Sequence, residues 1–149
     1  MKIVINASPL IFLRGINKLY LLNALYSDIY IPYVVLQEIE GLDISGLFYT
    51  PIKIINKTLV TDLLGTLHRG EVEVIVSAIE HNIQDVILDD LAARNKAKQF
   101  GLNVTGTLGV LRRGKNKNLI INLEQEIQLL RDNGMYLTDD IVQAVLRFD

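Results

Sequence analysis

The chain has 149 residues, a formal net charge of −2, no cysteine, and 50% hydrophobic against 7% aromatic residues. This length and apolar content predict one domain, residues 1–149, with a hydrophobic core, and exclude a disordered chain. No apolar run approaches the roughly 20 residues of a membrane span, and Met1-Lys2 leads directly into an expected strand, so neither a membrane anchor nor a secretory signal is expected. The lack of cysteine excludes disulfides and thiolate metal sites and favours a cytoplasmic location.

The N-terminal half predicts strands and helices in alternation. Ser8-Pro9 is expected to open the first helix, because Ser is a good N-cap and Pro suits the first helical position. Gly15 is expected to end that helix, and Asn17 to cap a second one that runs through Leu25. Residues 42–50 are expected to form a loop. The strands predicted here cover 2–5, 28–31 and 52–55, and the helices cover 8–14, 18–25, 32–40 and 58–67.

The middle of the chain predicts a helix, Glu71 to His81, and then a βαβ unit. Val86-Ile87-Leu88 is an apolar run that suits a buried parallel strand, and Asp89-Asp90 follows it. In an open α/β sheet the site lies beyond the carboxyl ends of the strands, which is where this acidic pair falls. The helix and second strand of the unit cover 91–100 and 102–105, with Gly101 between them.

The C-terminal segment predicts a turn or helix start over 106–111, a basic segment over 112–117, and two final helices over 123–132 and 138–148. Thr138 is the expected N-cap of the last helix. These elements together predict a three-layer α/β/α sandwich around a parallel sheet of four or five strands.

Charge is distributed unevenly along the chain. Residues 71–90 carry six acidic residues and no Lys or Arg, whereas residues 91–123 carry seven basic residues and no acid. An acidic cluster beside a basic flank is what a metal-dependent enzyme acting on a polyanion needs. The alternative is two solvated faces of opposite sign.

Four polar residues stand at strand ends or helix edges and are candidates for one site. They are Asn6, Glu38, Glu71 and Asp89. Oxygen ligands without histidine or cysteine suit Mg²⁺ or Mn²⁺, and such an ion supports hydrolysis of a phosphodiester. Each residue also has a structural interpretation: a turn former, a solvated helix residue, a first-turn acid and a helix cap, respectively.

Five segments, in this order, carry a likeness to a known family: 3–11 (IVINASPLI), 31–38 (IPYVVLQE), 70–75 (GEVEVI), 86–90 (VILDD) and 104–110 (VTGTLGV). With them the chain resembles the PIN-domain family of ribonucleases, in its small prokaryotic toxin-like branch, over nearly its whole length. The resemblance implies a PIN-like fold and a metal-dependent endoribonuclease that cleaves RNA.

The resemblance implies a role for each candidate residue. The four acidic positions of the family fall on Asn6, Glu38, Glu71 and Asp89, with Asp90 adjacent to the fourth and Ser8 as a supporting hydroxyl. Glu73 is the alternative third acid. Because residues 71 and 73 lie about 200° apart on a helix, only one of them is expected to face the site. These side chains are expected to share one cleft and to bind Mg²⁺ or Mn²⁺.

The resemblance also implies partners and leaves one alternative function. RNA, a cognate antitoxin protein and a second copy of the chain are the implied partners, with the RNA expected on the basic segment. A typical member has Asp where this chain has Asn6, which keeps a carbonyl oxygen but loses a negative charge. The alternative is therefore a PIN-fold module that binds RNA or protein without cleavage. A phosphoryl-transfer domain ranks last, because Asn6 cannot act as a nucleophile. The basic residues expected to flank the cleft are Arg112, Arg113, Lys115 and Lys117.

Overall fold

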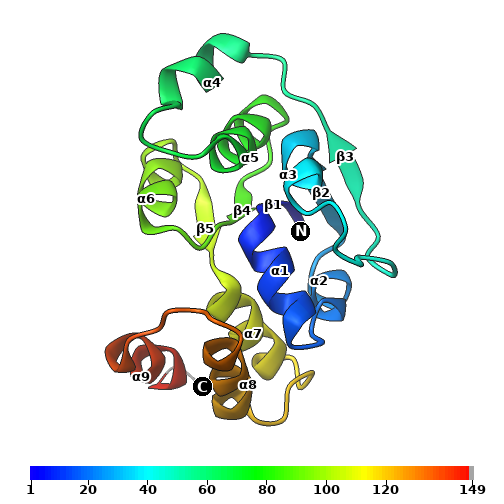
Figure 1. Cartoon of the computed structure of the whole chain (residues 1–149), viewed down its shortest axis with the longest axis vertical. Helices are drawn as coiled ribbons and strands as arrows, with labels where there is room; N and C mark the ends of the chain where they lie inside the picture. The colour runs from blue at the N-terminus through cyan, green and yellow to red at the C-terminus, as the bar shows by residue number, and fades with distance from the viewer. Residues whose placement is uncertain (148–149) are drawn as a thin grey trace.

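The computed structural model describes residues 1–147, which form five strands and nine helices (Figure 1). The strands make one all-parallel sheet in the order β3-β2-β1-β4-β5, as predicted. In the register, Ile3 pairs with Ile29 on one side and Asp85 on the other. All five carboxyl ends therefore lie along the same edge of the sheet. The strands are β1 (Lys2–Ile5), β2 (Asp28–Pro32), β3 (Thr50–Ile52), β4 (Asp85–Ile87) and β5 (Asn103–Thr105).

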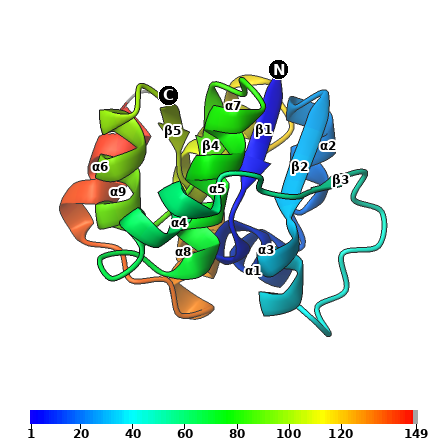
Figure 2. The ribbon, with the colours of Figure 1, turned by 90° about the horizontal axis from the view of Figure 1, so that it is seen from above.

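The helices complete the predicted three-layer sandwich. They are α1 (Ala7–Gly15), α2 (Tyr20–Leu25), α3 (Tyr33–Glu38), α4 (Lys57–Leu63), α5 (Arg69–Glu80), α6 (Leu91–Gln99), α7 (Thr107–Asn116), α8 (Leu123–Asp132) and α9 (Asp139–Arg147). Helices α4, α5 and α6 lie on one face of the sheet and α1, α2 and α7 on the other, with α8 and α9 beyond α7 (Figures 1 and 2). This is the arrangement that right-handed crossovers produce when the chain starts in the middle of a sheet.

Helix α5 is the most deeply buried helix segment. Residues 70–78 are all buried, and α5 packs on β1, β2 and β4 as well as on α3, α4 and α6. Val72, Ile75 and Val76 fill the contact with the sheet and are fully buried. The same burial also takes in two acidic residues, Glu71 and Glu73. Charged side chains in such positions need a partner or a function.

The start of α1 differs from the prediction. The helix begins at Ala7 with Asn6 in the N-cap position, so the expectation that Ser8 caps it is wrong. The Asn6 N–H donates to the Ile87 carbonyl oxygen (3.1 Å), which keeps the backbone of Asn6 in the sheet until the helix begins. Asn17 does not cap α2 either: it has a φ of 59° in the left-handed turn before that helix, which starts at Tyr20.

Strand β3 lies earlier in the chain than predicted, at Thr50–Ile52 instead of 52–55. The Ile55 N–H donates to Glu80 Oε2 (2.8 Å), and the Asn56 N–H donates to Glu80 as well. These bonds turn the chain from the sheet toward α4. Helix α3 ends at Glu38 and α4 at Leu63, each sooner than predicted.

The βαβ unit over 86–105 is confirmed, with α6 between β4 and β5 and with Gly101 in a left-handed conformation (φ 80°) after the helix. Asp90 is the N-cap of α6, since its Oδ2 accepts from the Ala93 N–H (3.0 Å). Helix α8 has the predicted bounds, and Thr138 Oγ1 accepts from the Ile141 N–H (3.2 Å) at the start of α9. Phe148, the predicted end of that helix, lies outside the described residues.

Substitutions at two adjacent residues of α1 test how this helix packs on its face of the sheet. Leu10 is fully buried and Ile11 is 45% exposed. We expect Leu10→Ala to lower the free energy of unfolding by about 2–5 kcal/mol, because it leaves a cavity in the core. Ile11→Ala is the matched control and should lower it by less than about 1 kcal/mol. Urea unfolding measures both, and equal losses would contradict the described packing of α1.

Candidate active site

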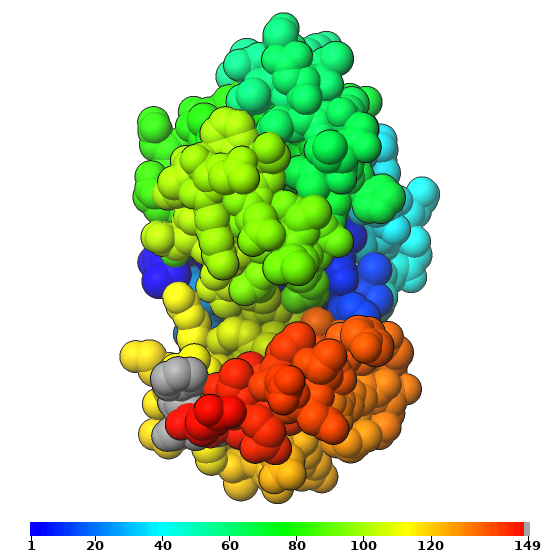
Figure 3. Space-filling view, turned by 90° about the vertical axis from the view of Figure 1, so that its left-hand side faces the viewer, coloured from blue at the N-terminus to red at the C-terminus, as the bar shows by residue number. Residues whose placement is uncertain are grey.

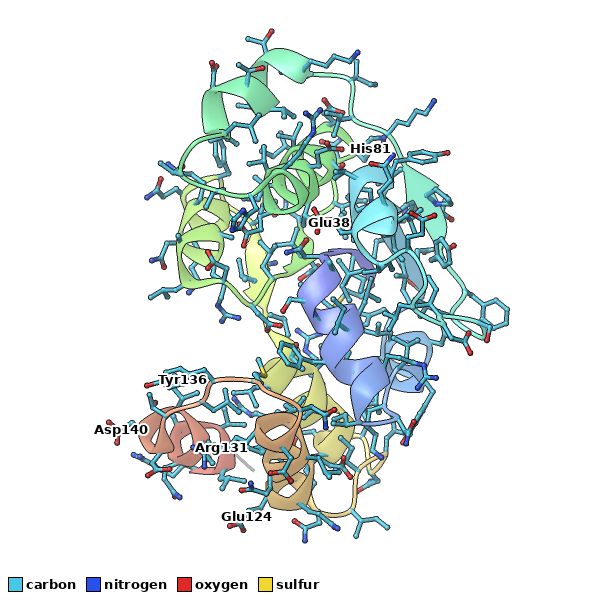
Figure 4. All side chains as sticks on the ribbon, in the orientation of Figure 1. Glu38, His81, Glu124, Arg131, Tyr136 and Asp140 are labelled. Atoms are coloured by element: carbon cyan, nitrogen blue, oxygen red, sulfur yellow. The ribbon has the colours of Figure 1, made fainter. Side chains whose placement is uncertain are left out.

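A pocket of about 570 Å³ opens at the carboxyl end of β1, where α1, α3 and the start of α5 meet. We call it the acidic pocket. Figure 4 shows one of its members, Glu38, between these three helices. Its lining residues are Asn6, Ala7, Ser8, Ile11, Phe12, Glu38, His68, Arg69 and Glu71. The structure thus brings together three of the four predicted site residues and the supporting Ser8, although they come from three distant parts of the chain.

Asn6 lines the pocket with an unsatisfied oxygen. The residue is 7% exposed, and its Oδ1 has no hydrogen-bond partner among the described residues. A buried polar atom without a partner destabilises a fold by about 1–3 kcal/mol, and such atoms are rare in native proteins. Because the backbone of Asn6 is held by Ile87, this oxygen is fixed at the end of the strand. It is therefore available to a ligand in the pocket.

The carboxylate of Glu38 lies against Gly70 in the first turn of α5. A methyl group in place of the Gly70 hydrogen would stand 2.5 Å from Glu38 Oε1 and 2.9 Å from Oε2, so a larger residue at position 70 would displace the carboxylate. Desolvation is the main cause that raises the pKa of Glu38, and the charge of Glu73 raises it further. His68 and a backbone hydrogen bond from Gly70 act in the opposite direction on this pKa. Protonation of Glu38 is thus easier than that of an ordinary glutamate.

Glu71 is the second carboxyl group of the pocket and is only 6% exposed. Its Oε1 accepts from the His68 backbone N–H (2.9 Å), which fixes the side chain at the start of α5. Burial raises the pKa of Glu71, and the negative charges of Asp90 and Glu38 also raise it, against the lowering effect of His68. The charges of Asp90 and Glu38 thus act on Glu71, and a cation beside Glu71 would offset them.

Glu73 does not line the acidic pocket. Its Oε2 accepts from Arg69 Nε (2.9 Å), so the two residues form an i, i+4 ion pair along α5. Arg69 itself lines the pocket beside Glu71, with more than half of its side chain exposed. Of the two predicted alternatives for the third acid, Glu71 is the one that lines the pocket, and Glu73 positions a basic residue next to it.

Asp89 lies apart from the acidic pocket. Its Oδ1 accepts from the Thr107 N–H (2.7 Å) and its Oδ2 from Thr107 Oγ1 (2.7 Å), so the carboxylate is bound to the start of α7. It lines a second groove instead. Asp90 is exposed at the start of α6, and its charge acts on Glu71. Neither Asp89 nor Asp90 lines the acidic pocket, and Asp90 is the one of the two whose charge acts on Glu71.

The four predicted RNA-binding residues lie on α7 or just after it, and none of them lines the acidic pocket. Arg112 and Arg113 line the second groove. The guanidinium of Arg113 also stacks over the ring of Tyr26, 5.7 Å from its centroid, and Lys115 Nζ donates to the Ile121 carbonyl oxygen (2.8 Å). Lys117 follows the last residue of the helix and is exposed.

Two residues of the pocket were missed in the sequence. His68 and Arg69 stand three and two residues before Glu71, at the N-cap and first position of α5, and both line the pocket. They place a basic side chain and an imidazole beside the carboxyl groups. The signal was their position next to a candidate acid, but no periodicity distinguishes such residues from an ordinary helix start.

The parallel sheet, with an oxygen-lined pocket at its carboxyl edge, defines an α/β protein with a candidate active site in the position usual for this class. A PIN-domain family model matches residues 2–148, and the chain belongs to the PIN-domain family. Membership indicates a nuclease-type function. No curated protein and no solved structure matches the chain. Within residues 1–147, no helix has both the length and the apolar character that a membrane crossing requires.

PIN domains generally use divalent metal ions. Among residues 1–147 no group of three or more His, Cys, Asp or Glu side chains is placed to hold a metal together. The pocket combines two carboxyl groups, Glu38 and Glu71, with the unpartnered Oδ1 of Asn6. This set contains only oxygen donors, which hard cations prefer.

The raised pKa of Glu71 predicts how stability depends on pH in the absence of metal. Because the folded-state pKa lies above the unfolded value, the stabilisation is complete below the unfolded pKa of about 4.5 and is lost as pH rises through the folded pKa. Glu71→Gln removes this loss while keeping an acceptor for the His68 N–H. We therefore expect its gain in the free energy of unfolding over the parent to grow as pH rises above about 4.5.

Urea unfolding in EDTA between pH 4 and 8 measures this difference. Glu40→Gln, on an exposed residue just after α3, is the control for loss of one negative charge. If Glu71→Gln and the parent show parallel pH profiles, the carboxyl group of Glu71 is not desolvated as described.

Proposed function

We propose that the protein is a ribonuclease that depends on Mg²⁺ or Mn²⁺ and hydrolyses RNA phosphodiester bonds in the acidic pocket. The observation that carries this proposal is the unpartnered Oδ1 of Asn6, buried in the same pocket as the carboxyl groups of Glu38 and Glu71. We assign the metal to these three residues, while Asp90, at the neighbouring helix start, adds its negative charge near Glu71. Asp89, the fourth ligand expected from the sequence, is hydrogen-bonded by Thr107 instead.

In the proposed hydrolysis the residues of the pocket have separate roles. A bound divalent ion supplies positive charge for the phosphate oxygens and lowers the pKa of a coordinated water. Glu71 would accept the proton of the attacking water, because its carboxyl group lines the pocket and is fixed there by the His68 N–H. The water oxygen bonds to phosphorus, the bond from phosphorus to one sugar oxygen breaks, and the leaving oxygen takes up a proton. Arg69 binds a non-bridging phosphate oxygen, held in place by Glu73.

We further propose that the protein is the toxin component of a toxin–antitoxin pair. The support is the resemblance of its five ordered segments to the toxin-like branch of the family. A cognate antitoxin and a second copy of the chain are the protein partners that this role implies. A toxin of this kind needs control, because unrestrained RNA hydrolysis harms the cell that makes it.

A second candidate is a PIN module that binds RNA or protein without cleavage. Two observations favour it: Asn6 provides a neutral ligand instead of a carboxylate, and Asp89 is already engaged by Thr107. Each lowers the negative charge available to a cation. The two candidates differ in whether RNA is cut when Mn²⁺ is present.

Removal of the proposed base tests the ribonuclease. In Mn²⁺, we expect Glu71→Gln to lower the rate of RNA cleavage by about 10²–10⁴-fold, because a positioned general base contributes that much. Glu40→Gln, which removes an acid outside the pocket, should cleave at the parental rate. Cleavage of a labelled RNA is measured by gel electrophoresis. Full activity in Glu71→Gln would move the chemistry elsewhere, and an inactive parent would favour the module without cleavage.

Asn6→Asp tests whether position 6 is a metal ligand. The substitution keeps the shape and adds a carboxylate, so we expect the Mn²⁺ affinity to rise by about tenfold or more. Without metal the added charge repels Glu38 and Glu71, so the free energy of unfolding should fall by about 1 kcal/mol or more, the equivalent of one pKa unit.

Calorimetric titration and urea unfolding in EDTA measure the two effects. Asn95→Asp, on the exposed side of α6, adds the same charge outside the pocket and should change neither quantity appreciably. If Asn6→Asp binds Mn²⁺ no better than the parent, position 6 does not contribute a ligand.

A further inference from the structure

A second groove, of about 780 Å³, lies between α6 and β5 on one side and α7, α9 and the connection before α9 on the other. We call it the C-terminal groove. In Figure 3 it runs across the waist of the molecule, between the yellow-green α6 and the orange-red C-terminal helices. We propose that this groove binds single-stranded RNA and stacks a base on Tyr136, next to the acidic pocket. This inference rests on the proposed ribonuclease function and extends it to the form of the substrate.

The charge of the groove complements a phosphate backbone. Three arginines, Arg94, Arg112 and Arg113, line it. Arg94 Nη1 donates to the Leu88 carbonyl oxygen (3.1 Å) and Arg113 Nη1 to the sulfur of Met1 (3.2 Å), which are uncharged acceptors. Among the described residues that line the groove, Asp89 is the only acid, and Thr107 binds both of its oxygens. The lining of the groove therefore carries a net positive charge, which favours a polyanion.

Tyr136 gives the groove a flat aromatic surface. It lies on the connection between α8 and α9, on the side toward α6 (Figure 4), and it is 88% exposed. Leu91, 71% exposed at the start of α6, lines the same groove. A nucleic-acid base has two apolar faces, so it can cover both an aromatic ring and an aliphatic side chain. In a duplex these faces are already stacked, which restricts the fit to single strands.

The two sites adjoin at the end of β4. Asn6 of the acidic pocket donates its N–H to the Ile87 carbonyl oxygen (3.1 Å), and the Leu88 N–H donates to the carbonyl oxygen of Thr105 in the C-terminal groove (3.0 Å). Only β4 lies between these two strand ends, which places them roughly 10 Å apart at the usual spacing of neighbouring strands. A strand that leaves the groove past Asp89 thus brings its next phosphates to the proposed metal site. The groove would then select which phosphodiester is presented for cleavage.

Binding is measured without metal, so that it does not depend on cleavage. The probes are a fluorescein-labelled 12-nucleotide single-stranded RNA, the same strand in a duplex, and a strand of equal length without bases, all in EDTA. We expect the full chain to bind the single strand most tightly. Tyr136→Ala should weaken this binding by about 5- to 150-fold, the range measured for loss of a stacked base. Tyr136→Phe keeps the ring and should bind nearly as the parent does.

Two variants separate stacking from charge. Tyr49→Ala removes another exposed tyrosine, just before β3 and outside the groove, and should leave RNA affinity unchanged. Arg94→Ala should reduce the salt slope of binding by about 0.7, one phosphate contact on a single strand. Since Tyr136 is almost fully exposed, its truncation should preserve the fold, which circular dichroism checks.

The outcomes distinguish this proposal from the proposed function. If the single strand binds through Tyr136 but the parent does not cleave it in Mn²⁺, the groove is retained and the ribonuclease is overturned. If the parent cleaves RNA and Tyr136→Ala binds it as tightly as the parent, the groove proposal is overturned alone. Equal binding of the strand without bases also overturns it, and absence of any RNA binding overturns it in favour of a protein occupant.

Discussion

The burial of helix α5 is the constraint on which the site depends. Because α5 packs on three strands and on three helices, its first turn is fixed at the carboxyl edge of the sheet. This fixes Glu71 inside the protein and brings Gly70 against Glu38, so a buried and an exposed carboxyl group line the same pocket. The pKa of each is raised by desolvation first and by neighbouring charges second. The packing that stabilises the core therefore produces a pocket in which either carboxyl group is protonated more easily than in water.

Asp89 and Asp90, two neighbouring carboxylates after β4, have different partners. Successive residues of an extended chain point in opposite directions, so Asp89 and Asp90 face different sides of the sheet edge. Asp89 receives two hydrogen bonds from Thr107 and anchors α7, while Asp90 caps α6 and adds its charge near Glu71. Both therefore have structural roles as helix-start acceptors. The cap interpretation and the site interpretation of this pair are compatible, because a cap fixes the carboxylate that the pocket uses.

The sequence predicted the sheet and the order of the site residues better than it predicted their neighbours. The run 86–90 and Gly101 defined the βαβ unit because they combine an apolar strand, a cap and a left-handed helix end, all of which are local signals. Strand β3 was misplaced because Glu80, distant in sequence, binds the backbone of Ile55. The basic segment was expected at the pocket, but α7 carries it away from there, since the direction of that helix depends on its packing against α1 and α2. Tertiary contacts of this kind leave no periodic pattern.

Asn6 shows how the fold and the chemistry limit each other. An aspartate there would bring a third carboxylate into the acidic pocket, beside two whose pKa is already raised. An amide avoids that repulsion, and it retains an oxygen that no described residue satisfies. The metal-free protein is thereby more stable than a fully acidic version, and the affinity for a cation is correspondingly lower. In the ribonuclease that we propose, a weaker metal site would leave more of the substrate binding to groups outside it. Arg69 within the pocket and the arginines of the adjoining groove would then bind the phosphates that flank the reacting one.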